Sequence, residues 1–152
     1  GFGCELVLKT TKPGIWAFKL LRRLVYYIVS YSGTLSPGIM LQMDAQLFPP
    51  EKSDIKGIIV WYVDEAPDCI YQLPSGSFGM FSVVGITSDE CEFIESIGDY
   101  GCWCIQQIMR EEGHGQLTEP ERKSVMTGQD IAAKVSSMRS YLENFGFSTG
   151  NL

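Results

Sequence analysis

The sequence has 152 residues, 45% of them hydrophobic, which predicts a single globular domain with an ordinary core and excludes a disordered chain. The most apolar window, residues 15–30, contains three cationic side chains and is too short to span a membrane, so we expect a soluble, cytoplasmic protein with no membrane partner. The formal net charge is −6, and residues 40–99 hold eleven acids and two lysines, a net −9 that repels phosphate and argues against nucleic-acid binding.

The first half of the chain predicts strands around one long helix. A strand is expected over residues 4–9, and the longest helix candidate covers residues 15–31. Two more strands are expected over residues 39–43 and 58–63, and a short one over residues 69–73. The helix is predicted to pack on the core through one stripe, with Lys19, Arg22 and Arg23 opposite or beside it, and the stripe comprises Ala17, Leu20, Leu21, Leu24, Val25 and Ile28.

Residues 78–97 hold the densest set of local signals. Residues 78–86 are apolar on both faces of a strand, which predicts a central strand covered on both sides. Thr87 and Glu90 then have the spacing of a capping box, so a helix is expected to start here. A carboxylate in that role contributes about 1 kcal/mol of stability.

The last third of the chain predicts two more helices. One lies between the break at residues 98–99 and Gly113, and the other covers residues 129–144, with apolar side chains at spacings of four, three and four. Residues 116–126 are polar and are expected to form an edge strand or an extended segment. The predicted class is therefore α+β, with helices packed on a mixed β-sheet in a single domain.

The sequence offers few residues for catalysis or metal binding. His114 lies between two glycines with no assigned partner, and the usual nucleophile and phosphate-binding motifs do not occur, so we expect no enzyme and no cofactor. Cys102 and Cys104 leave a thiol enzyme as a minor alternative, but they lack a second ligand pair at zinc spacing, so no metal site is expected. Cys4 and Cys91 are expected to be small buried hydrophobes in a reducing compartment.

Two groups of acids are the candidate binding residues. A loop follows the strand at residues 58–63, and a helix face follows the capping box; both would steer a basic protein partner. The alternatives are that the acids only keep the surface soluble or, for the loop, that they hold a divalent ion. The candidates are Asp64, Glu65 and Asp68 in the loop, and Asp89, Glu92 and Glu95 on the helix.

Several short motifs, in order, resemble the suppressor of fused domain family. They are the opening Gly-Phe-Gly-Cys-Glu-Leu, the long helix with Trp16, the run from Phe78 to Glu90, and Leu-Thr-Glu-Pro-Glu-Arg-Lys-Ser from residue 117. The resemblance covers residues 1–128, which we take as the domain; residues 129–152 form a C-terminal helix and tail that we do not match. The motif residues are Gly1, Gly3, Glu5, Gly85, Thr87, Glu90, Thr118 and Arg122.

The resemblance implies a domain that binds other proteins and is not an enzyme. The animal namesake restrains Gli transcription factors in Hedgehog signalling by gripping a peptide as an added strand, whereas bacterial relatives are proposed to be immunity proteins that neutralise toxins. We expect the stand-alone, toxin-neutralising kind here, with a basic toxin as the partner and a Hedgehog-type regulator as the alternative. The family has a further segment before Gly-Phe-Gly, which this sequence lacks. It also departs from the animal protein at Ile39-Met40 and from the family's Thr-Asp pattern at Thr118-Glu119.

Overall fold

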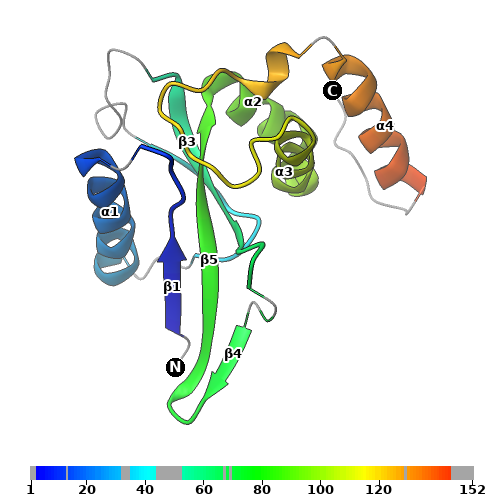
Figure 1. The fold of residues 1–152 in the computed structure, drawn as a ribbon. Coiled ribbons are helices and arrows are strands. Elements are labelled where there is room, and N and C mark those ends of the chain that lie inside the picture. The colour runs from blue at the N-terminus through cyan, green and yellow to red at the C-terminus, as the bar shows by residue number, and fades with distance from the viewer. Residues whose placement is uncertain are drawn as a thin grey trace.

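The computed structural model describes residues 3–12, 14–31, 35–43, 53–66, 68, 70–128 and 130–144 (Figure 1). Strands and helices of these residues build one mixed sheet with helices on it, which confirms the predicted α+β class. In chain order the elements are β1 (Gly3–Val7), α1 (Ile15–Tyr31), β2 (Met40–Gln42), β3 (Ile55–Tyr62), β4 (Ile70–Leu73), β5 (Gly76–Thr87), α2 (Ser88–Ile97), the 3₁₀ turn η1 (Gly98–Tyr100), α3 (Gly101–Glu111), the 3₁₀ turn η2 (Val125–Thr127) and α4 (Ile131–Asn144).

The central strand of the sheet is β5, as its two apolar faces predicted. The strand order is β1-β5-β3-β2, and β4 pairs with the first residues of β5. β1 runs parallel to β5, while β3 and β4 run antiparallel to it. The pairing with β1 ends at Val7 and Ser82, so the last residues of β5 have a strand on the β3 side only.

Helices cover both faces of this sheet, with α1 on one face and α2, α3 and α4 on the other (Figure 1). Side chains of β5 alternate between the two layers because successive residues of a strand point to opposite faces. Phe81 and Val83 pack in the α1 layer, and Val84 and Ile86 pack in the layer of the other three helices.

The long helix α1 has the predicted bounds, but one member of its predicted stripe points away from the core. Leu20 and Leu24 are buried, together with Trp16, whereas Val25 is 52% exposed. A helix advances 100° per residue, so Trp16 shares the inward face with Leu20 while Val25 lies on the edge of the outward one. The prediction that Val25 belongs to the core was wrong.

The elements after β5 follow the predicted order. α2 starts at Ser88 after Thr87, whose backbone N–H donates to the Glu90 carboxylate at 2.8 Å, as the predicted capping box requires. The last helix, α4, packs on the core through Leu142, which is 2% exposed, and through its neighbours on the predicted stripe. No helix of the described residues has the length and apolar character that crossing a membrane requires.

One prediction needs correction, and the structure decides between two alternatives left open for another segment. Cys4 is exposed, although it was expected to be buried, because β1 is an edge strand that is covered incompletely. Of residues 116–126, those before η2 form the extended segment of the two options, with a single bridge between Leu117 and Lys9 in place of a strand.

Candidate functional site

The extended segment after α3 crosses β5 where β1 ends, and its side chains take over the role of a neighbouring strand. Thr118 is fully buried; its hydroxyl accepts from the Gly85 backbone N–H at 2.9 Å and faces the Val83 carbonyl at 3.5 Å. Its own N–H donates to the Lys9 carbonyl at 2.8 Å. Buried backbone groups that lack a strand partner must be satisfied in some other way, and here one threonine satisfies them.

A buried ion pair fixes the same segment to α2. Arg122 and Glu90 are 7% and 0% exposed, and the two guanidinium nitrogens Nη1 and Nη2 donate to the two carboxylate oxygens at 2.6 and 2.5 Å. Arg122 also donates to the Gly85 carbonyl at 2.8 Å, and the N–H of Val125 donates to Glu90 at 2.9 Å. A buried pair needs its remaining hydrogen-bonding positions filled, and here both Nη groups have further acceptors while the buried Arg122 Nε has none among the described residues. The Glu90 carboxylate therefore joins the helix cap, β5 and the segment beyond α3.

Gly85 lies between these contacts and has no room for a side chain. A Cβ atom there would be 2.7 Å from Cγ2 of Thr118 and 3.0 Å from Cδ1 of Ile55. A glycine within a strand permits such a close approach, and the approaching group is Thr118.

The structure brings most of the motif residues of the sequence resemblance together. Five of them meet at the end of β5, namely Gly85, Thr87, Glu90, Thr118 and Arg122. Gly3 and Glu5 lie apart from this cluster on β1, and Gly1 lies outside the described residues. The cluster is almost inaccessible to solvent, so its members hold the fold and leave partner contacts to other surfaces.

The acidic loop after β3 is largely neutralised by cations from other elements. Asp64 forms an ion pair with Arg110 of α3, and Glu65 forms one with Lys9. The Lys9 hydrogen bond lowers the pKa of Glu65. Asp68 is exposed. The loop therefore presents less negative charge than its sequence suggests.

The acids of α2 divide into one that serves the helix and two that face solvent. Although burial opposes it, hydrogen bonds with the Ser124 and Thr87 side chains hold the pKa of Asp89 below its usual value. Glu92 and Glu95 are exposed on the helix, and Glu95 accepts from the Gln42 side chain at 3.0 Å. These two carboxylates remain the most accessible of the predicted group.

The two acidic groups do not meet in one surface. β3 and β5 pair from Ile55 and Thr87 at one end to Tyr62 and Phe81 at the other. The loop follows one end of this pair and α2 follows the opposite end, so about 20 Å of strand separates them at 3.3 Å per residue. A small partner can therefore contact one group at a time.

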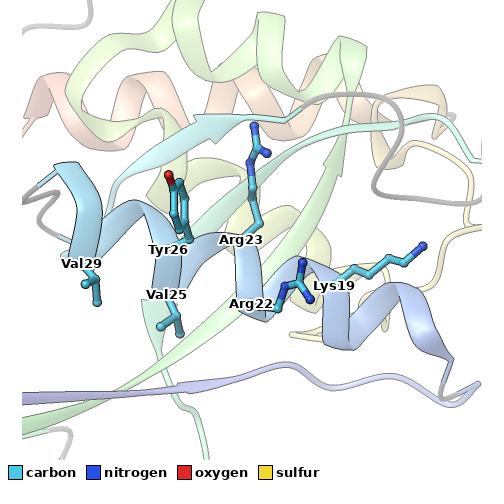
Figure 2. Close-up of a pocket in the computed structure, with 6 residues that line it drawn as sticks. All are labelled: Lys19, Arg22, Arg23, Val25, Tyr26 and Val29. Carbon is cyan, nitrogen blue, oxygen red and sulfur yellow. The ribbon is translucent and has the colours of Figure 1, made fainter.

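The outward side of α1 is a surface that the sequence interpretation missed. It combines exposed apolar and cationic side chains around a hollow of about 730 Å³ (Figure 2). The sequence could have indicated this surface, because α1 contains more apolar residues than the single stripe that packs on the sheet. The residues lining the hollow are Lys19, Arg22, Arg23, Val25, Tyr26 and Val29.

The thiols of the second layer do not have the environment of a nucleophile. Cys102 and Cys104 are buried, and loss of hydration raises the pKa of each to about 11. A reactive thiol needs a lowered pKa and access to solvent. Cys91 has the same character, and Cys69 lies outside the described residues. Among the residues that the structure describes, no group of three or more His, Cys, Asp or Glu side chains is placed to hold a metal ion.

These features define an α+β domain in which a mixed sheet lies between helices and a buried Glu–Arg pair closes the end of the central strand. The sequence model for Suppressor of fused protein (SUFU) matches residues 1–123, and the chain belongs to this family. No curated protein matches the chain.

Two solved structures share the fold. The crystal structure of Drosophila Suppressor of Fused superposes with a TM-score of 0.66 at 19% identity over 90% of this chain. The crystal structure of the Sufu–Fu complex gives 0.64 at 18% identity over 96% of this chain. This chain spans 30% and 55% of the two matched chains, so the likeness concerns the fold of one part of each.

Proposed function

We propose that this chain is a non-catalytic protein-binding domain that neutralises a basic partner toxin in the cytoplasm. Membership of the SUFU family supports protein binding, and the accessible carboxylates Glu92 and Glu95 on α2 are the observation on which the contact site depends. Charges on the rim of an interface raise the association rate with a partner of opposite sign. The net charge of −6 favours such a partner as a whole.

The outward face of α2 is a better docking site than the loop after β3. Asp64 and Glu65 already pair with Arg110 and Lys9, so a basic partner would have to displace these cations. Glu92 and Glu95 form no ion pair with a described residue, and Glu95 accepts one hydrogen bond from the neighbouring Gln42. The proposed interface therefore centres on α2 beside the edge strand β2.

A Hedgehog-type regulator of a transcription factor is the second candidate function. It is favoured by the structural likeness to Drosophila Suppressor of Fused and to the Sufu–Fu complex. The two candidates differ in the partner: a toxin is released by salt and loses its toxicity when bound, whereas a transcription factor is held through a peptide.

The experiment is capture of partners from the source cell with this chain as bait, followed by kinetics with the purified partner. We expect a basic protein that is toxic when expressed alone and harmless when this chain is co-expressed. The double variant Glu92→Lys and Glu95→Lys should slow association about tenfold or more and flatten its salt dependence. The matched control, Asp64→Lys with Glu65→Lys, should have the smaller effect on the association rate.

Three results would reject parts of the proposal. Capture of a non-toxic transcription factor would reject the toxin-neutralising role and support the Hedgehog-type regulator. Turnover of a substrate by the purified chain would reject a binding domain altogether. Unchanged association kinetics in the α2 variant, with toxicity still suppressed, would leave the function in place and move the interface to another surface.

A further inference from the structure

The helix α1 is apolar on its outward side as well as on the side that packs on the sheet. Four outward residues are Ile15, Phe18, Val25 and Val29, which are 74%, 68%, 52% and 77% exposed. Single exposed hydrophobic residues are ordinary, but a contiguous set along one helix marks an interaction surface. Neither the fold nor the toxin-binding proposal uses this side of α1.

The outward residues repeat at the spacing of a helix seam. Ile15, Phe18, Arg22, Val25 and Val29 follow one another at intervals of three, four, three and four residues. This is the a/d pattern that places side chains between two packed helices. We call these five residues the outward seam. Arg22 is its central member and the only charged one.

The outward seam borders two hollows that meet along α1. Val25 and Val29 line both the hollow of about 730 Å³ on the helix and a second one of about 440 Å³ between α1 and the edge strand β1. Figure 2 shows these two valines pointing to one side of α1, while Tyr26 and Arg23 point to the other. An elongated partner can therefore lie along α1 with contacts on both sides of the seam.

The charges on α1 select the kind of partner. The helix has three cations and no acid, and Lys19 and Arg22 form no ion pair with any residue that the structure describes. If a second copy packed its own α1 antiparallel on this one, the two Arg22 side chains would meet at the centre of the seam. Like charges in that position oppose association, whereas an acidic side chain there would form an interhelical ion pair.

We propose that the outward seam of α1 docks an amphipathic helix of a partner protein, with apolar residues at heptad spacing and an acidic residue opposite Arg22. The mode is the packing of an apolar helix face against a complementary one. The site lies across the sheet from α2 and has the opposite charge, so it is separate from the proposed toxin contact. One chain can then hold a basic partner and an acidic helix at the same time.

The test uses two designed helical peptides that differ at one position. Both carry leucine at the a and d positions of four heptads, and the central seam position is glutamate in one and lysine in the other. Fluorescence anisotropy at moderate salt gives Kd for each peptide. We expect the glutamate peptide to bind about tenfold or more tightly than the lysine peptide.

Charge reversal on the protein provides the decisive variant. Arg22→Glu should invert the preference, so that the lysine peptide binds the more tightly, and a gain of binding cannot result from unfolding. Lys56→Glu, an equal charge change at an exposed position of β3, should leave the preference unchanged. Circular dichroism confirms that both variants remain folded.

Several outcomes would overturn the proposal. Equal Kd values for the two peptides, failure of both to bind, or a preference that Arg22→Glu does not invert would each do so. A dimer of the free chain that Val29→Glu dissociates would assign the seam to a second copy. Binding to vesicles of anionic phospholipid in preference to the glutamate peptide would assign it to a membrane surface.

Discussion

The two layers that cover the sheet differ in how completely they are closed. α3, which α2 and α4 flank, buries seven of its 11 residues, whereas α1 buries three of its 17; α4, the outermost helix of the closed layer, buries one of its 14. The exposed side of α2 carries Glu92 and Glu95, whose charges are hydrated by solvent. The exposed side of α1 carries the apolar residues Phe18 and Val29. The closed layer thus has the pattern of a finished globular surface, and the open layer has the pattern of a surface that another helix completes.

The difference begins at the end of β5, where a buried ion pair joins elements of the closed layer. Glu90 belongs to α2, and Arg122 belongs to the segment that leads to α4, so their pair ties together the elements of the closed layer. On the other face, α1 is connected to the sheet by apolar packing of three buried side chains. Variants at these places should therefore have unequal effects on stability.

The largest effect is expected from breaking the buried ion pair. Glu90→Ala or Arg122→Ala should lower the free energy of unfolding by about 3–5 kcal/mol, because the remaining charge stays buried without its partner. This exceeds the roughly 1 kcal/mol of a helix cap, which was all that the sequence suggested for Glu90. Urea denaturation measures the change, with the exposed Glu92→Ala on the same helix as the control.

The control should change stability by no more than about 0.5 kcal/mol. A loss of about 1 kcal/mol or less in Glu90→Ala would show that the carboxylate acts as a cap and nothing more. In that case the closed layer would not depend on the contact between α2 and the segment that carries Arg122.

A smaller loss is expected at Gly85. Gly85→Ala should cost about 1–3 kcal/mol, since the new methyl group overlaps Cγ2 of Thr118 at 2.7 Å and Cδ1 of Ile55 at 3.0 Å. Thr118→Ser removes the first of these methyl groups and keeps the hydroxyl that accepts from the Gly85 N–H. The double variant should therefore recover part of the loss, and strict additivity of the two changes would contradict the overlap.

Sequence periodicity predicted the elements that are defined by local signals. The bounds of α1, the start of α2 at Thr87 and Glu90, and the central position of β5 all follow from repeats or caps within twenty residues. The predicted orientation of Val25 was wrong because α1 is apolar on both sides. The spacing of apolar residues cannot show which of two apolar sides faces the sheet.

The contacts that connect distant segments could not be predicted in this way. Glu90 and Arg122 are 32 residues apart, and the local sequence around neither residue predicts that they pair. Asp64 and Glu65 were correctly placed in a polar turn after β3, but their pairing with Arg110 and Lys9 depends on how α3 and β1 pack. The use of the acidic groups for partner binding stays a prediction.

The smallest effect is expected from Val25→Ala on the open layer, and comparison with its neighbour Leu24 distinguishes the two sides of α1. Leu24 and Val25 are neighbours on α1, and they are 1% and 52% exposed. Leu24→Ala should cost about 2–5 kcal/mol through lost burial and the cavity left behind, whereas Val25→Ala should change stability by no more than about 0.5 kcal/mol. Thermal and urea denaturation of the isolated chain measure both.

If Val25→Ala cost as much as Leu24→Ala, some part of this same chain would already cover the outward seam, and no outside helix would be needed to complete it. A neutral Val25→Ala that nonetheless weakens the glutamate peptide would separate the two sides of α1, one holding the fold and the other holding a partner.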